Sequence, residues 1–266
     1  MFFAAILAAL LTFLVLITGG LATTATSLPV PEGVLTYALL HRQAGEFIGA
    51  ALVALFAWIS FARPQLRKLS GGLCLGVIAQ GVLGAMPLGS ASALLHSCLA
   101  QFLFAGAAAL AVAASPGWSR EPHLIPDYGW PSLRSLSISL PVLVALQIAL
   151  GAAFRHRMLG LMPHVIGAML ISMFILIVGS FVLQQCKEHK ALSGSGRVMM
   201  ATTFLQIFLG LAVFTVRSMP KQEASAILAI ATAHVVTGAA LLAACVVLGM
   251  HIRRNVVPKD AAPKKA

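Results

Sequence analysis

Charged and aromatic residues are scarce in this sequence of 266 residues. Charged residues make up 9% and aromatic residues 7%, whereas 59% of the residues are hydrophobic and the mean hydropathy is +0.95. So little polar surface cannot cover a water-soluble globule of this size, which excludes a soluble globular protein. The surrounding solvent must therefore be largely lipid.

Long apolar runs recur at the length that crosses a membrane. A hydrocarbon core of about 30 Å is spanned by roughly 20 apolar residues in a helix. Such runs lie near residues 3–22, 41–62, 70–88, 92–114, 135–154, 164–184, 198–216 and 226–250. The first run lacks a basic segment before it and exceeds the usual apolar length of a signal peptide, so we interpret it as a helix. The sequence predicts an all-α membrane protein with eight transmembrane helices.

Acidic residues are few, with seven against eighteen basic residues and a net charge of +11. Thirteen basic residues fall on one side of the predicted spans, at Arg63, Arg67, Lys68, Arg120, Arg134, Lys187, Lys190, Arg197, Arg253, Arg254, Lys259, Lys264 and Lys265. The other side holds Arg42, Arg155, Arg157, Arg217 and Lys221. Lys and Arg concentrate in cytoplasmic loops, so we predict a multi-pass protein of the plasma (inner) membrane with both termini cytoplasmic. Membrane lipid, and no nucleic acid, is the partner that this charge distribution indicates.

The four cysteines are poorly placed for disulfides. Cys74, Cys98 and Cys245 fall within predicted spans, and Cys186 lies at a helix end on the cytoplasmic side. Because no pair reaches an oxidising compartment, we predict no disulfide bond. The spacing of cysteines and histidines also fits neither a zinc site nor a c-type haem attachment.

The longest cytoplasmic connection divides the spans four and four. We predict two pseudo-symmetric four-helix bundles, 1–114 and 135–251, joined by a linker at 115–134 and followed by a basic tail at 252–266. A Gln-x-x-Leu-Gly element recurs in the third, fifth and seventh spans, at residues 80–84, 147–151 and 206–210. It serves either helix packing, with Gly allowing close approach and Gln bonding across the interface, or the lining of a shared cavity.

Four histidines occupy equivalent places in the outer part of the even-numbered spans. They are His41, His96, His164 and His234, with His41 and His164 expected at helix starts and the others one to two turns further in. The residue four positions later is always small, at Gly45, Ala100, Ala168 and Gly238. A single intramembrane histidine usually bonds to a neighbouring helix, but four in matching positions beside small residues fit a flat macrocycle. We predict haem iron ligation by His41 with His96 and by His164 with His234.

Two arginines and one glutamate are the other polar residues that could act with these histidines. Arg42 and Arg155 are the basic residues best placed to bind anionic haem propionates, although an arginine at a helix end also extends to the membrane surface. Glu46 is the one carboxylate within a predicted span. It either forms an i,i+4 ion pair with Arg42 or carries protons beside the first histidine pair. The remaining histidines, His123, His156, His189 and His251, are interpreted as ordinary surface residues.

Several segments of the sequence resemble the haem A synthase family. They are GGLAT at 19–23, HRQAG at 41–45, LHSCLAQ at 95–101, QIALGAAFR at 147–155, Pro163-His164 and AHVVTGA at 233–239. The resemblance implies that the N-terminal half is a haem O substrate site, with His41 and His96 as its catalytic residues; Glu46 is our own candidate for a catalytic carboxylate there. It implies a bound haem b on His164 and His234 in the C-terminal half.

In that family a methyl group of haem O is oxidised to a formyl group, which gives haem A for terminal oxidases. The resemblance implies that electrons pass through haem b, and that the cofactor carries the redox chemistry while the protein supplies ligation and orientation. The partners it implies are the enzyme that makes haem O and a terminal oxidase.

Two features depart from the family pattern. Ala38 occupies a position where the family commonly has Glu, and residues 23–40 contain no cysteine pair. Either Glu46 or Glu32 replaces the missing carboxylate, or the protein is a di-haem b-type cytochrome. Such a cytochrome would act only in electron transfer or as an accessory subunit of a respiratory complex. A transporter is a third alternative, but the sequence lacks the further buried charges of a substrate path.

Overall fold

Eight long helices account for most of the chain in the computed structural model, which describes residues 1–28, 34–86, 89–221 and 223–259. They are α1 (Phe2–Ala25), α2 (Val34–Ala62), α3 (Arg67–Ala85), α4 (Ser90–Ala113), α5 (Leu133–Arg155), α6 (Leu161–Gln185), α7 (Lys190–Ser218) and α8 (Ala224–Asn255). Two 3-10 helices, η1 (Pro64–Leu66) and η2 (Pro116–Ser119), and two short strands, β1 (Ile125–Pro126) and β2 (Val256–Val257), complete the described elements. Eight helices are long and apolar enough to cross a membrane, so the predicted all-α membrane fold is confirmed.

Several helices extend beyond their predicted apolar runs. α2 begins at Val34 and not near residue 41, α7 begins at Lys190 and not near 198, and α8 continues to Asn255. The backbone stays helical past the hydrocarbon because its polar groups still need partners where lipid gives way to water. His41 therefore lies about two turns inside α2, and His234 almost three turns inside α8, which corrects their expected depths.

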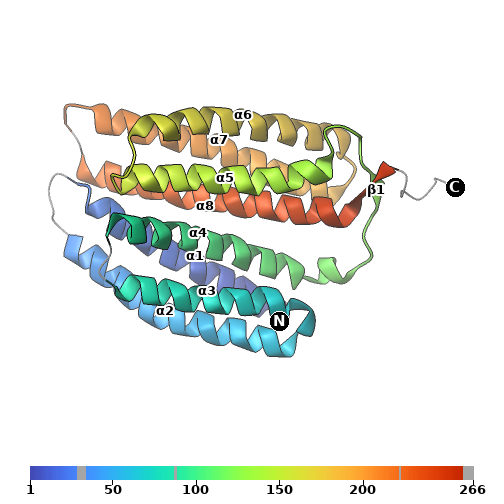
Figure 1. The fold of residues 1–266 in the computed structure, drawn as a ribbon, viewed down its shortest axis with the longest axis horizontal. Coiled ribbons are helices and arrows are strands. Elements are labelled where there is room, and N and C mark those ends of the chain that lie inside the picture. The colour runs from blue at the N-terminus through green and yellow to red at the C-terminus, as the bar shows by residue number, and fades with distance from the viewer. Residues whose placement is uncertain (29–33, 87–88, 222, 260–266) are drawn as a thin grey trace.

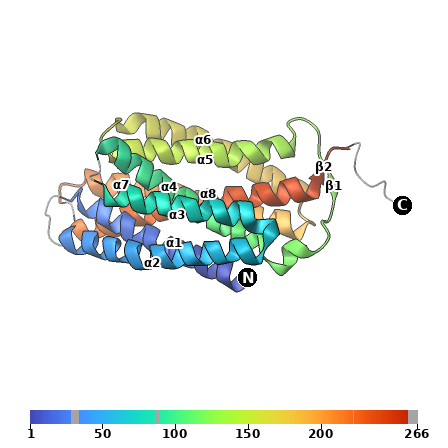
Figure 2. The same ribbon diagram turned by 60° about the horizontal axis from the view of Figure 1, so that its bottom comes forward.

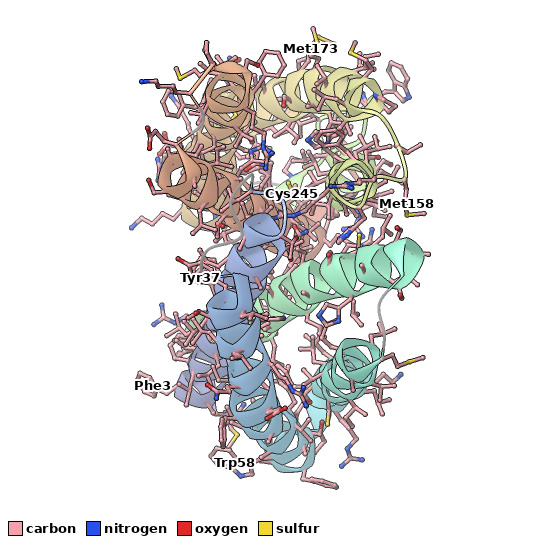
Figure 3. All side chains as sticks on the ribbon, turned by 90° about the vertical axis from the view of Figure 1, so that its left-hand side faces the viewer. Phe3, Tyr37, Trp58, Met158, Met173 and Cys245 are labelled. Atoms are coloured by element: carbon pink, nitrogen blue, oxygen red, sulfur yellow. The ribbon has the colours of Figure 1, made fainter. Side chains whose placement is uncertain are left out.

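The helices pack as two four-helix groups (Figure 1). In the first group α1 and α3 each contact both α2 and α4, and in the second α5 and α7 each contact both α6 and α8. Helix α8 also packs against α1 and α4, and α4 contacts α5. Figure 3 looks on to the end that carries Tyr37 and Met158 and shows the two groups side by side. In this arrangement α2 lies diagonally opposite α4, and α6 lies diagonally opposite α8.

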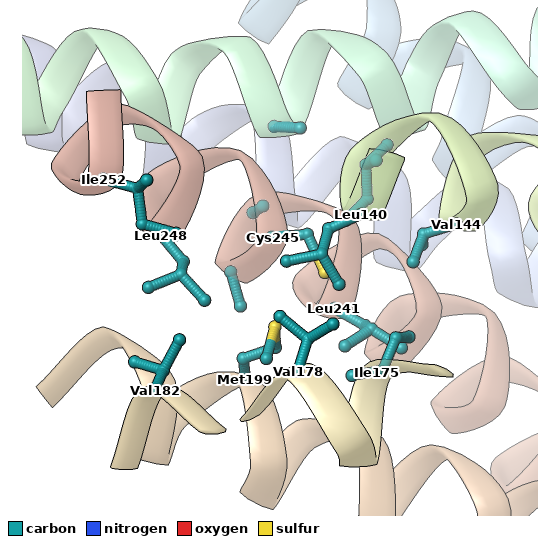
Figure 4. Close-up of a cluster of buried hydrophobic side chains, with 14 of the residues drawn as sticks. Leu140, Val144, Ile175, Val178, Val182, Met199, Leu241, Cys245, Leu248 and Ile252 are labelled. Carbon is teal, nitrogen blue, oxygen red and sulfur yellow. The ribbon is translucent and has the colours of Figure 1, made fainter. Parts of the chain in front are cut away.

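Each group has its own apolar core. In the second group Leu140, Val178, Met199 and Leu248 are buried around α8 (Figure 4). The first core gathers Phe56, Ile59, Leu73 and Leu110 with small residues of α1. All four cysteines are free thiols. The fold therefore rests on helix packing and not on covalent cross-links.

A buried carboxylate organises the connection between the two groups. Asp127 follows β1, and its carboxylate accepts hydrogen bonds from the Ser132 hydroxyl, from the backbone N–H of the adjacent Tyr128 and from the first two backbone N–H groups of α5. Burial acts to raise the pKa of Asp127, but these hydrogen bonds outweigh it and hold the pKa below its ordinary value. β1 pairs in parallel with β2, and Arg134 donates to the Val256 carbonyl. The end of α8 is thus fastened to the linker.

Candidate functional site

The structure brings together the four intramembrane histidines in the two predicted pairs. The ring centroids of His41 and His96 are 6.3 Å apart, with the ring planes at 82°. Those of His164 and His234 are also 6.3 Å apart, with the planes at 87°. Each pair joins diagonal helices, so the imidazoles meet across the middle of their four-helix group.

The separation of the rings matches two imidazoles on one metal ion. A bond from a metal ion to an imidazole nitrogen is about 2 Å long, and the ring centroid lies roughly 1 Å further away. Two imidazoles that approach one ion from opposite sides therefore have centroids about 6 Å apart. The same distance also suits an edge-to-face aromatic contact, so the surroundings of the rings have to distinguish the two cases.

Each imidazole lies against a glycine of the preceding helix. A Cβ atom added to Gly19, Gly84, Gly151 or Gly210 would lie 3.0, 3.1, 2.8 or 3.0 Å from Cε1 of His41, His96, His164 or His234, respectively. Three of these glycines, Gly84, Gly151 and Gly210, are the last residues of the Gln-x-x-Leu-Gly elements. Their close contact with the imidazoles favours the interpretation that these elements serve helix packing. Gly19 is the fourth member, which the sequence analysis missed because Val15 and Thr18 replace the Gln and Leu of the repeat.

A hydroxyl group orients His41. The Thr18 hydroxyl donates its only proton to the Val15 carbonyl at 2.8 Å, and its oxygen lies 3.0 Å from His41 Nδ1. With the hydroxyl proton used in this way, the oxygen is suited to accept from His41 Nδ1, and that tautomer leaves Nε2 unprotonated. The Nε2 lone pair of His41 is left for another partner, as a metal ligand requires.

The glutamines of the repeat support the other three histidines. Gln80 Nε2 donates to the His96 carbonyl at 3.1 Å, and Gln147 Nε2 donates to the His164 carbonyl at 2.8 Å and lies 2.9 Å from its Nδ1. Gln206 Nε2 lies 3.3 Å from His234 Nε2. The buried polar atoms without a hydrogen-bond partner among the described residues are His96 Nδ1, His234 Nδ1 and the Oε1 atoms of these glutamines. An unmet buried polar group costs about 1–3 kcal/mol, so their gathering here indicates a site built for a further group.

Arg155 crosses the seam between the two groups. Its Nη2 donates to the Gly20 carbonyl at 3.2 Å and to the Thr24 hydroxyl, both on α1. Its charge also acts on His234. No salt bridge to Arg155 is found within residues 1–28, 34–86, 89–221 and 223–259. A cation at membrane depth is costly without an anion, so Arg155 is suited to a carboxylate ligand.

His156 is not the ordinary surface residue that we predicted. It is half-buried, and its Nε2 lies 3.0 Å from the Ser97 hydroxyl, which immediately follows His96. Burial lowers the pKa of His156, and the positive charges of Arg155 and His96 lower it further. The prediction was wrong because only the tertiary packing of α5 against α4 shows this contact.

Arg42 and Glu46 are not brought to the facing histidine rings by the described contacts. Arg42 Nε and Glu46 Oε1 form an i,i+4 ion pair at 3.0 Å, with side chains 78% and 60% exposed. This is the first of the two alternatives considered for Glu46. Glu32 lies outside the described residues.

The comparison with known families gives this arrangement its context. Residues 34–164 match the model of the cytochrome oxidase assembly protein family. Over these residues, just under half of its length, the chain is similar to this family. The match supports the predicted resemblance to haem A synthases, and the matched stretch contains His41, His96 and His164. No curated protein matches the chain with significance.

Proposed function

We propose that this protein is a haem A synthase-type oxidoreductase that oxidises a methyl group of haem O to a formyl group. His41 and His96 bind the substrate porphyrin in the first group, and His164 and His234 hold haem b in the second. The observation that carries the proposal is the repeated pair of facing imidazoles, each backed by a glycine and separated by 6.3 Å.

The donor set supports haem over other metal centres. A six-coordinate haem iron takes two imidazoles from opposite faces of the macrocycle. Structural zinc takes four ligands, and no group of three or more His, Cys, Asp or Glu residues able to hold a metal ion is found in the described part of the chain. The Nδ1–H tautomer of His41 and the unmet polar atoms at His96 and His234 also fit.

The protein residues at the second site have distinct tasks. His164 and His234 would hold haem b through their imidazoles, and Gly151 and Gly210 let these imidazoles lie between helices without displacement. Arg155 binds a propionate carboxylate through a charge-assisted hydrogen bond. Haem b, when bound, supplies a one-electron redox centre next to the substrate site.

Glu46 is the carboxylate to test for proton transfer at the first site, although the structure pairs it with Arg42 and does not bring it to the histidine rings. It lies five residues after His41 on α2 and is held by Arg42 in the exposed ion pair. Glu46→Gln is expected to lower turnover and to leave haem binding intact, because the side chain is not a ligand. If Glu46→Gln retains full turnover, Glu32→Gln is the next variant to test.

The absence of Glu at position 38 favours a second candidate function. Ala38 occupies that place, and Glu46 is paired to Arg42. In this second candidate function, both sites bind haem b and the protein transfers electrons without modifying a porphyrin. The geometry of the histidine pairs serves both functions equally. The product therefore distinguishes them.

The test is to express the protein together with a haem O supply and to extract its pigments. Haem A or a hydroxylated precursor supports the synthase, and the His41→Ala variant is the matched control that should make neither. Haem b alone in the wild-type protein overturns the synthase and supports the electron carrier. We further propose that the protein lies in the plasma membrane with cytoplasmic termini. It would then receive haem O from the enzyme that makes it, or pass haem A to a terminal oxidase.

A further inference from the structure

A cleft of about 520 Å³ lies at the end of the molecule that carries both described chain ends, far from the histidine pairs. It forms where the two four-helix groups meet, between the start of α1, the end of α4 with η2, the start of α7 and the end of α8. Figure 2 shows the N-terminus beside the segment that follows α4. The cleft is separate from the proposed haem sites, and its function does not depend on theirs.

The walls of the cleft combine two chemistries. Phe2, Ile6 and Val112 provide an apolar side, whereas Arg120 and Arg254 provide positive charge. Glu121 is the one acidic residue in the lining. The cleft is therefore amphipathic, with more positive than negative charge.

Arg254 is held firmly at the edge of the cleft. Its guanidinium lies 4.5 Å from the ring centroid of Trp118 and donates to the Gly117 carbonyl at 3.4 Å and to the Arg120 carbonyl. A cation stacked on an aromatic ring keeps its charge while losing mobility. Arg254 thus presents a fixed positive charge beside an indole ring.

The histidines of the cleft form its wall and are not suited to metal binding. His189 is buried, contrary to our prediction of a surface residue, because Nδ1 accepts from the Leu192 N–H and Nε2 lies 3.1 Å from the His123 carbonyl. His123 stacks on His189 with ring centroids 5.1 Å apart, and His251 packs 5.6 Å from the Trp118 ring. Both nitrogens of His189 are engaged, so an organic anion suits this cleft better than a metal ion.

We propose that the cleft binds a phospholipid with an anionic headgroup. Basic pockets between transmembrane helices bind such headgroups, and this cleft lies where α1 begins and α8 ends, at the level of the membrane surface. The phosphate lies against Arg120 and Arg254, and an acyl chain follows Phe2, Ile6 and Val112. A lipid in this place joins the two four-helix groups at the end opposite the histidines.

Trp118 provides a direct probe of the site. The chain has three tryptophans, so Trp58→Phe with Trp130→Phe leaves Trp118 as the sole indole. The full-length protein is placed in phosphatidylcholine vesicles that contain a small fraction of brominated phosphatidylglycerol or of brominated phosphatidylcholine. We expect the anionic quencher to be about fivefold more effective on Trp118. A protein that keeps only Trp58, which is exposed on α2, should respond to the two quenchers alike.

Substitutions at neighbouring arginines complete the test. Arg120→Gln and Arg254→Gln should each reduce the preference for the anionic quencher, whereas Arg253→Gln should preserve it because Arg253 does not line the cleft. Arg254→Gln also removes the contact with Trp118, so Arg120→Gln is the cleaner variant. Equal quenching by both lipids, or a preference unchanged in both variants, would overturn the proposal. If excess inorganic phosphate abolishes the preference for the anionic quencher, the cleft binds free phosphate, and the proposal of a bound phospholipid is overturned.

Discussion

The two four-helix groups present the same pair of imidazoles but hold them with different side chains. In the first group His41 is fixed by the hydroxyl of Thr18, and in the second His164 is fixed by the amide of Gln147. Only the second pair lies next to Arg155 at the seam and within a core built around the central helix α8. The two groups therefore share the geometry of the imidazole pair, which glycine and helix packing set. They differ in the side chains that contact the imidazoles. Under the proposed function, that difference separates an exchanging substrate from a permanent cofactor.

Removing one imidazole from each pair tests the separation with the largest expected effect. His164→Ala should abolish the stable b-type absorbance of the purified protein, because haem b loses an axial ligand. His41→Ala should leave most of that absorbance, since it changes only the first pair. Visible spectra of both variants measure this, and an equal loss would contradict the division between the two groups.

Thr18→Val tests the hydroxyl that distinguishes the first group. The substitution keeps the shape of the side chain but removes the oxygen that accepts from His41 Nδ1. Loss of such a supporting partner weakens metal binding by about 10–100-fold, so haem affinity of the first site should fall by that order. Titration of haem into the His164→Ala background measures the first site alone. Thr23→Val, which changes a threonine one turn further along α1, is the matched control.

Glycine substitutions test the geometry that both groups share. Gly84→Ala and Gly151→Ala place a methyl group 3.1 and 2.8 Å from the imidazole of His96 and His164, respectively. Each should weaken haem binding at its own site by about 1 kcal/mol, or roughly fivefold, because the ring must shift. Gly81→Ala is the control, since no atom lies within 4 Å of a Cβ at that position. If Gly151→Ala altered both sites equally, the two groups would not be independent.

Asp127→Asn addresses the connection between the groups and is expected to change stability and not haem binding. The folded state holds the pKa of Asp127 below its unfolded value of about 3.9, so the carboxylate contributes stability at neutral pH. This contribution is complete above about pH 4 and disappears as the pH falls through the lower pKa of the folded state. At pH 7 the variant should lose about 1–2 kcal/mol, seen as a lower Tm.

The difference in Tm between Asp127→Asn and the wild-type protein should shrink on acidification. Glu188→Gln, which alters an exposed carboxylate, should leave Tm unchanged across the same range. A constant difference between Asp127→Asn and wild type at every pH would show that the hydrogen bonds of Asp127 do not depend on its charge.

Sequence patterns predicted the eight spans and the pairing that the structure shows for the histidines, because the length of each apolar run and the repeated position of the histidines can be read from the sequence. They misjudged the starts of α2 and α7, since helical hydrogen bonding continues beyond the apolar residues. The contact between His156 and Ser97 joins residues 59 positions apart and needed the tertiary structure. Gly19 could have been predicted from the sequence, because each of the four histidines has such a glycine in the preceding helix, even where the Gln of the repeat is missing.

Each histidine is backed by a glycine from the helix that precedes it, yet it faces a ring from the neighbouring pair of helices. A single helical hairpin thus carries only one of the two histidines of a pair and cannot form the pair by itself. Four helices are the smallest unit that brings two imidazoles face to face in this architecture. The described part of the chain contains that unit twice.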